Sequence, residues 1–178
     1  FANHEMMYNN FLKYIGLTVI LLLLQFLVLN NINFLGYINP YIYLLIILLM
    51  PYRVSRWMLL IIGFTLGFAV DYFSNTLGLH ATASLVLAYF RPVILNRWSF
   101  KSVQDIRGVP DVSNTSLEWF IVYALIAVLV HHFTLFVLEV FTFKHFWLTL
   151  VRIILSTAVS TFFIVIIELL RAPNKMTK

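Results

Sequence analysis

Cysteine is absent from this sequence, and charged residues are scarce. Of the 178 residues, 11% are charged, and only 7 side chains are acidic. Without cysteine there is no disulfide, no thiolate metal site and no cysteine nucleophile. Soluble domains average about 25% charged residues, so the composition excludes a soluble globular protein.

Apolar side chains replace the missing polar ones, since 62% of the residues are hydrophobic. The runs are apolar on every side, whereas the strands of a membrane barrel alternate apolar and polar residues. At about 20 residues per spanning helix, we predict an all-α polytopic membrane protein with about six transmembrane helices. The predicted spans are 11–30, 38–51, 57–73, 77–96, 117–143 and 146–171.

These spans form one predicted domain, residues 11–171, followed by a cytoplasmic tail at 172–178. The second span is short because Pro40 and Pro51 bracket it. We expect it to be tilted, to extend past Pro51, or to cross the membrane only partly.

The predicted N-terminal tail, residues 1–10, looks partly like a remnant of cloning, because a native chain could begin at Met6 or Met7. The first apolar run is predicted to be a retained helix, since no small-residue cleavage site of a signal peptide follows it.

The basic residues are distributed unevenly between the two sides of the predicted bundle. Ten of the 12 fall on one side, and this count places Arg91 in the connection after the fourth span. Lys144 is on the other side, and Arg152 lies inside the sixth span. The positive-inside rule then places both termini in the cytoplasm. The net charge of +5 is assigned to lipid headgroups, and no nucleic-acid partner is expected.

The longest polar stretch is the predicted cytoplasmic loop 97–118, which carries Arg97, Lys101 and Arg107. Loops of this length are usually functional or disordered, so a docking loop and a solvated linker both remain open. Thr115 and Glu118 have the spacing of a capping box that would begin the fifth span.

The third span carries Gly63, Gly67 and Asp71, which are four residues apart and share one helical face. Small residues at this spacing let another helix backbone approach closely. Asp71 either needs a partner, water or a proton, or simply caps the following turn. Gly78 supplies backbone freedom in that turn, and His80 is interpreted as a packing residue.

Glu139 and Arg152 lie at similar depth in the last two spans, and we predict an intramembrane ion pair between them rather than a proton relay. Glu168 has Arg171 three residues away on its own helix. The adjacent His131 and His132 point about 100° apart and cannot share a metal ion.

No catalytic, metal or cofactor motif is present. The prediction is therefore no catalytic residue, no metal, no cofactor and no enzymatic activity.

The segment GFTLGFAVDYFSNTLGLHATASLVLAYFRPVIL, residues 63–95, resembles the signature region of MreD, the rod-shape-determining membrane protein family of bacteria. The residues that carry the resemblance are Gly63, Gly67, Asp71, Leu77 and Gly78. The resemblance implies the fold of the substrate-binding S components of energy-coupling-factor transporters and a location in the bacterial cytoplasmic (inner) membrane. It also implies that Gly63, Gly67 and Asp71, with Gly78, shape the hairpin between the third and fourth spans.

The implied role is that of a non-enzymatic scaffold of the cell-elongation complex, which binds an MreC-like bitopic protein and regulates lateral peptidoglycan synthesis. RodA, its partner transpeptidase and MreB are further implied partners. The alternative hypothesis is a small-molecule-binding S component of a vitamin transporter. An intramembrane hydrolase ranks last, because no nucleophile and base have suitable spacing.

Overall fold

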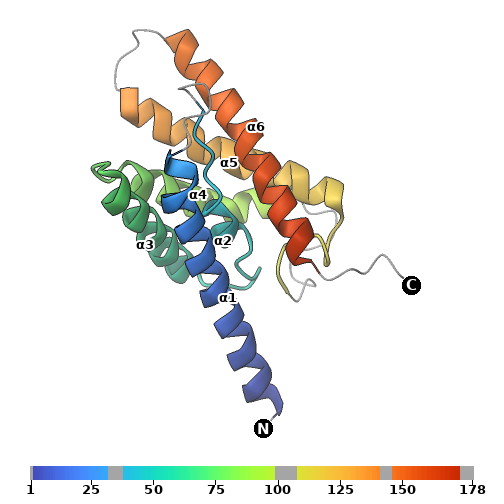
Figure 1. The fold of residues 1–178 in the computed structure, drawn as a ribbon. Helices are drawn as coiled ribbons and strands as arrows, with labels where there is room; N and C mark the ends of the chain where they lie inside the picture. Colours follow the sequence, from blue (N-terminus) through green and yellow to red (C-terminus); the bar gives the residue numbers. More distant parts are fainter. Residues whose placement is uncertain (1, 32–37, 99–107, 141–145, 173–178) are drawn as a thin grey trace.

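The described part of the chain is built from helices. The computed structural model describes residues 2–31, 38–98, 108–140 and 146–172. Its elements, shown in Figure 1, are α1 (Ala2–Leu27), the 3-10 helix η1 (Leu29–Asn31), α2 (Leu44–Leu48), α3 (Arg56–Ser74), α4 (Leu79–Trp98), α5 (Leu117–Val140) and α6 (Phe146–Arg171). The all-helical prediction is confirmed. Residues 2–10, the predicted N-terminal tail, form the beginning of α1.

Within the described ranges, three helices are long and apolar enough to cross a membrane: α3, α5 and α6. Their outward faces carry exposed apolar residues at helical spacing. On α5 these are Ile121, Leu125, Leu129, Phe133 and Val137. A continuous apolar stripe of this kind suits hydrocarbon rather than water, which supports a helical membrane protein.

Consecutive helices pack side by side as hairpins, α3 with α4, α4 with α5 and α5 with α6. One end of this bundle contains the turn 74–79 and is called here the hairpin end. The other contains residues 108–116 and is called the loop end. At the hairpin end α1 packs against the end of α3. The side-chain amide of Asn30 donates to Ser74 Oγ at 2.9 Å, and the centroids of the Phe26 and Phe73 rings are 4.3 Å apart.

The second predicted span does not form a spanning helix. Its helical part, α2, has five residues, a rise of about 7.5 Å against a hydrocarbon core of about 30 Å. Residues 41–49 are all buried, with exposures of 0–7%. The segment runs from Asn39, which lines the same pocket as Ser74 and Thr76 of the hairpin end, to Tyr52 at the loop end, where the backbone amide of Tyr52 donates to Gly108 O at 3.1 Å. Of the expected alternatives, a partly crossing helix describes α2 best.

Proline explains why the chain does not continue as a helix here. Pro40 and Pro51 each lack an N–H group and restrict the residue before them to extended conformations. An unwound backbone at membrane depth is tolerated only inside the protein, where its polar groups find other partners. We call residues 38–43 the unwound segment.

Side chains of two neighbouring helices satisfy the unwound segment. Gln25 of α1 is fully buried. Its side-chain Nε2 donates to Pro40 O at 3.0 Å, and its Oε1 accepts from the backbone amide of Ile42 at 3.0 Å. From α6, Ser160 Oγ accepts from the Tyr41 amide at 3.0 Å and Ser156 Oγ from the Asn39 amide at 3.3 Å. The apolar helices thus keep polar groups where the backbone needs them.

Arg91 performs the same task at the end of α2. Counting it as a loop charge is wrong, since it lies within α4 and is only 1% exposed. Its guanidinium donates to the carbonyl oxygens of Leu48, at 3.2 Å, and Met50. Tyr123 of α5 also donates to Leu48 O, at 3.1 Å, and accepts from Arg91 Nε at 3.0 Å.

We expect Gln25→Met to lower the free energy of unfolding by about 2–4 kcal/mol, because it leaves Pro40 O and the Ile42 amide buried without partners. The measurement is denaturant-induced unfolding in detergent micelles. The matched control is Leu24→Met, which places the same residue on an exposed position of α1 and should change stability by less than about 0.5 kcal/mol. Equal midpoints for the two variants would contradict the role of Gln25.

Candidate functional site

The glycines of the predicted motif bring α3 and α4 into close contact. A Cβ atom at Gly67 would lie 2.4 Å from His80 O and 2.6 Å from Ala81 Cα, both backbone atoms of α4. At Gly63 it would meet Ala88 Cβ at 2.9 Å and Ser84 O at 3.0 Å. The close approach expected from this spacing is therefore made within the chain, and the glycine face is covered by α4.

Asp71 closes the same hairpin as a cap. It is 5% exposed, and its Oδ1 accepts from the His80 amide at 3.0 Å and from Thr76 Oγ1 at 2.6 Å. Its Oδ2 accepts from the Ala81 amide at 2.8 Å. A carboxylate in this position satisfies the first free N–H groups of α4. Of the two interpretations offered by the sequence, the geometry matches the cap.

The turn between these helices needs left-handed backbone at two positions. Asn75, which ends α3, has a φ of 53°, and Gly78 has a φ of +83°. Such angles cost little for Gly and are tolerated by Asn. The side chain of Leu77, by contrast, is fully exposed at the tip. The motif residues Gly63, Gly67, Asp71 and Gly78 thus form one structural unit.

His80 follows the hairpin turn and belongs to a buried polar cluster between α2, α4 and α5. Its Nδ1 lies 3.4 Å from the Tyr43 hydroxyl. The same hydroxyl lies 2.8 Å from His131 Nε2 and 3.0 Å from Ser84 Oγ. All four side chains are at least 97% buried. Polar groups in hydrocarbon are costly unless they are paired, so this cluster fixes the position of the chain just before α2.

His80, His131 and His132 are not arranged as a set of metal ligands. His131 and His132 have ring centroids 5.5 Å apart with planes at 73°, and His132 turns to Ser160 and to Val128 O of its own helix. Across the described residues, no three His, Asp or Glu side chains are placed to hold a metal ion. The three histidines therefore act here as hydrogen-bonding residues of the core.

A pocket of about 380 Å³ opens at the hairpin end, next to the start of the unwound segment. Glu139 and Arg152 line it and form the expected ion pair, with Arg152 Nη1 3.0 Å from Glu139 Oε1. Both side chains keep contact with solvent, and the guanidinium carbon also lies 4.3 Å from the centroid of the Phe136 ring. Further polar lining comes from Asn30, Asn39, Ser74, Thr76 and His80.

The pocket has the properties of a ligand site, because concave sites usually combine apolar walls with a few convergent polar groups. Its walls come from segments far apart in the sequence, including Phe26 of α1, Phe73 of α3 and Leu135 of α5. Unwound backbone beside polar side chains is also the arrangement used by membrane transporters to bind substrates.

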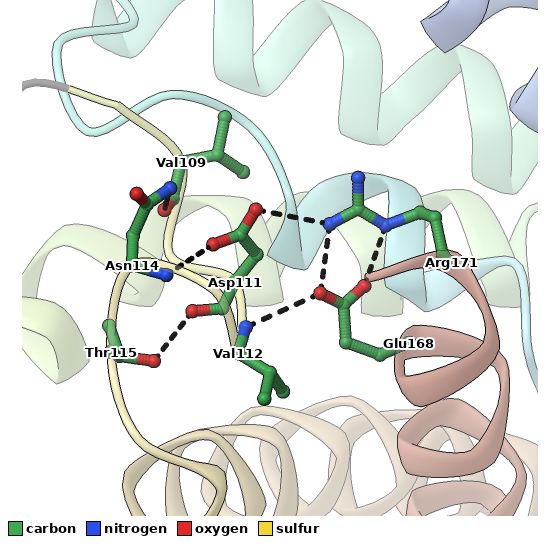
Figure 2. Close-up of polar contacts among 7 residues, drawn as sticks. All are labelled: Val109, Asp111, Val112, Asn114, Thr115, Glu168 and Arg171. Atoms are coloured by element: carbon green, nitrogen blue, oxygen red, sulfur yellow. Dashed lines mark hydrogen bonds and ion pairs between the residues drawn. The ribbon is translucent and has the colours of Figure 1, made fainter. Parts of the chain in front are cut away.

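At the loop end, Arg171 joins two carboxylates, as Figure 2 shows. Its Nε lies 2.7 Å from Glu168 Oε2, and its Nη2 lies 3.3 Å from Asp111 Oδ2. Glu168 Oε1 also accepts from the Val112 amide at 3.3 Å. Asp111 in turn accepts from the Asn114 amide at 2.8 Å. The second half of loop 97–118 is thereby fastened to α6.

Three basic residues and a capping box are also predicted for this loop. Arg97 is exposed in the last turn of α4, whereas Lys101 and Arg107 lie outside the described residues. The predicted capping box is off by one residue, because Ser116 Oγ accepts from the Trp119 amide at 3.2 Å. Thr115 instead donates to Asp111 O at 2.6 Å.

Sequence reasoning missed the polar residues in and around the unwound segment and α2: Gln25, Tyr43, Arg91, Ser156 and Ser160. A signal existed for Gln25, since it is the one polar side chain in the apolar run 19–29. Ser156 and Ser160 are four residues apart and share a face of α6.

Comparisons with protein-family models, curated proteins and solved structures find no match to this chain.

We expect Gly67→Ala to destabilise the protein by about 1–3 kcal/mol, because the new methyl group overlaps backbone atoms of α4 that cannot rotate away. Gly63→Ala should cost less, since its nearest neighbour is a side-chain methyl group. Gly16→Ala in α1 is the control, because nothing lies within 4 Å of its Cβ position. Unfolding of the three variants in micelles measures their order of stability. A Gly67 variant as stable as the Gly16 variant would contradict the close packing of α3 against α4.

Proposed function

We propose that this protein is a non-enzymatic membrane scaffold of the bacterial cell-elongation complex, which binds an MreC-like bitopic protein and regulates lateral peptidoglycan synthesis. The observation that carries the proposal is the α3–α4 hairpin. Four of the five motif residues of the MreD resemblance have a defined part in it: Gly63 and Gly67 in packing, Asp71 in capping, and Gly78 in the turn.

The use of the polar residues supports a scaffold rather than an enzyme. Asp71 and Glu168 are both buried acceptors of backbone N–H groups, and Arg91 is bound to carbonyl oxygens. Groups engaged in this way hold the fold together and are not available to transfer protons.

A partner helix would find an apolar surface on α3. Because α4 covers the glycine face, the exposed side carries Trp57, Ile61, Phe64, Phe68 and Tyr72, with exposures of 49–78%. These residues follow helical spacing along the length of α3. In lipid, such a surface can pack against a single spanning helix through dispersion contacts. RodA, its transpeptidase and MreB would join through the assembled complex.

In the proposed arrangement the protein lies in the bacterial inner membrane with both termini in the cytoplasm. Six segments then cross between the two sides, the second as the unwound segment followed by α2. This is the arrangement that the resemblance to S components implies, with the loop end facing the cytoplasm.

Co-purification tests the scaffold. A tagged MreC-like protein, expressed with this chain, should retain it through membrane solubilisation. Gly67→Leu should reduce the retained amount at least fivefold, because a distorted hairpin misplaces the outer face of α3. Gly16→Leu should retain it fully, and membrane insertion of both variants is checked by fractionation. Full retention by the inserted Gly67 variant would count against a hairpin-dependent interface.

A second candidate function, a small-molecule-binding S component, is favoured by the pocket at the hairpin end. Its volume of about 380 Å³ falls in the range of small-ligand sites, roughly 300–1,000 Å³. The Glu139–Arg152 pair offers one acceptor and one donor of opposite charge to a polar ligand.

Native mass spectrometry separates the two functions. If the pocket is a ligand site, protein isolated from its own membranes should carry one bound small molecule, and Arg152→Gln should lose it. Arg97→Gln, which removes an exposed charge at the other end of the bundle, should keep it. Wild-type protein without an added mass would reject the S-component function and leave the scaffold proposal intact.

A further inference from the structure

A second cavity lies at the loop end, opposite the pocket already described. It has a volume of about 210 Å³ and is bounded by the 51–55 connection, the start of α3 and the last turns of α4. Its polar lining consists of Tyr52, Arg56, Arg91 and Asn96. Neither the scaffold function nor the ligand pocket uses these residues.

The lining of this cavity is basic. Two arginines, Arg56 and Arg91, are among its lining residues, and none of its described lining residues is acidic. Arg91 uses Nε and Nη2 for its protein hydrogen bonds. Among the described residues, no carboxylate forms an ion pair with it and no acceptor meets its Nη1. A buried guanidinium without a counter-charge is costly, so an anion in the cavity would stabilise it.

Tyr52 also lines the cavity and carries a neutral donor. Its hydroxyl oxygen is buried and has no partner in the described structure. Burial raises the pKa of Tyr52 to about 12, so the hydroxyl keeps its proton at neutral pH and can donate to an anion. Guanidinium and hydroxyl donors around one space suit the oxygens of a phosphate group.

The surface beside the cavity is apolar and faces lipid. Trp57 and Met58 of α3 are 78% and 55% exposed, and Val93 of α4 is 50% exposed. Tryptophan at the end of a membrane helix marks the level of the headgroups. An anion held at this cavity would therefore lie where phospholipid headgroups are found, with space for acyl chains along α3 and α4.

We propose that this cavity is a binding site for one anionic phospholipid, with the phosphate held by Arg56, Arg91 and Tyr52. Soluble phosphate has the same chemistry, but it would leave the neighbouring apolar surface unused. The site is independent of the proposed scaffold function, since it involves neither the glycine face nor the exposed stripe of α3 beyond Trp57.

Native mass spectrometry of the full chain in detergent, titrated with phosphatidylglycerol or phosphatidylcholine, tests the site. We expect one phosphatidylglycerol to bind at least fivefold more tightly than the lipids that follow it and than phosphatidylcholine. Arg56→Gln and Tyr52→Phe should each weaken this first site by roughly fivefold, the effect of about one lost charged or donor contact near a membrane surface. Arg56 is exposed, so its substitution should leave the fold intact, which a thermal melt checks.

Arg97→Gln is the matched control, because it removes one exposed positive charge from the same end of α4 without lining the cavity. It should keep the first lipid. Equal losses for the Arg56 and Arg97 variants would show general surface attraction and overturn the proposal. Inorganic phosphate is titrated in parallel; binding of phosphate as tight as that of phosphatidylglycerol would overturn the assignment to a lipid.

Discussion

The structure depends on one constraint: the unwound segment 38–43 runs at membrane depth without helical hydrogen bonds, so its polar backbone groups must find partners in the protein. Gln25, Ser156 and Ser160 meet this need within the segment. Arg91 and Tyr123 do the same for carbonyl oxygens at the end of α2, which follows it. Each of these side chains would be costly in an apolar helix on its own. The unwound segment and the polar positions of α1, α4, α5 and α6 therefore explain one another.

The same constraint determines how the helices are arranged. The segment that leads to α2 occupies the interior, so the remaining helices surround it and pack mainly against their neighbours in sequence. Close packing of α3 on α4 through Gly63 and Gly67 places α3 at the edge of the bundle. Its other face is then available to lipid or to another protein. A scarcity of polar residues becomes informative in this setting, because most of the buried ones that the structure describes have a structural partner, Thr157 and Thr161 being exceptions.

Helices with clear ends could be predicted from the sequence. The third, fourth, fifth and sixth spans agree with α3 to α6 within a few residues, and the hairpin residues and the Glu139–Arg152 pair lie together as expected. The second span could not be read correctly, because a run of apolar residues is equally consistent with a lipid-facing helix and a buried segment. The position of Arg91 was predicted wrongly for a related reason. It lies six residues before Arg97, so the sequence places it at the end of the span, and only the structure shows that it binds the carbonyl oxygens of Leu48 and Met50.

The two ends of the bundle differ in their charge balance, and this difference determines what each can bind. At the hairpin end Arg152 already has Glu139 as its counter-ion, so a charged ligand would have to break that pair, whereas a neutral or zwitterionic one would not. At the loop end the acidic partners Asp111 and Glu168 are both engaged by Arg171, and the cavity beside Arg91 keeps its positive charge uncompensated. Of the two cavities described, the proposed lipid site is therefore the one that suits an anion. Selectivity between the two cavities thus follows from which arginine has a carboxylate partner.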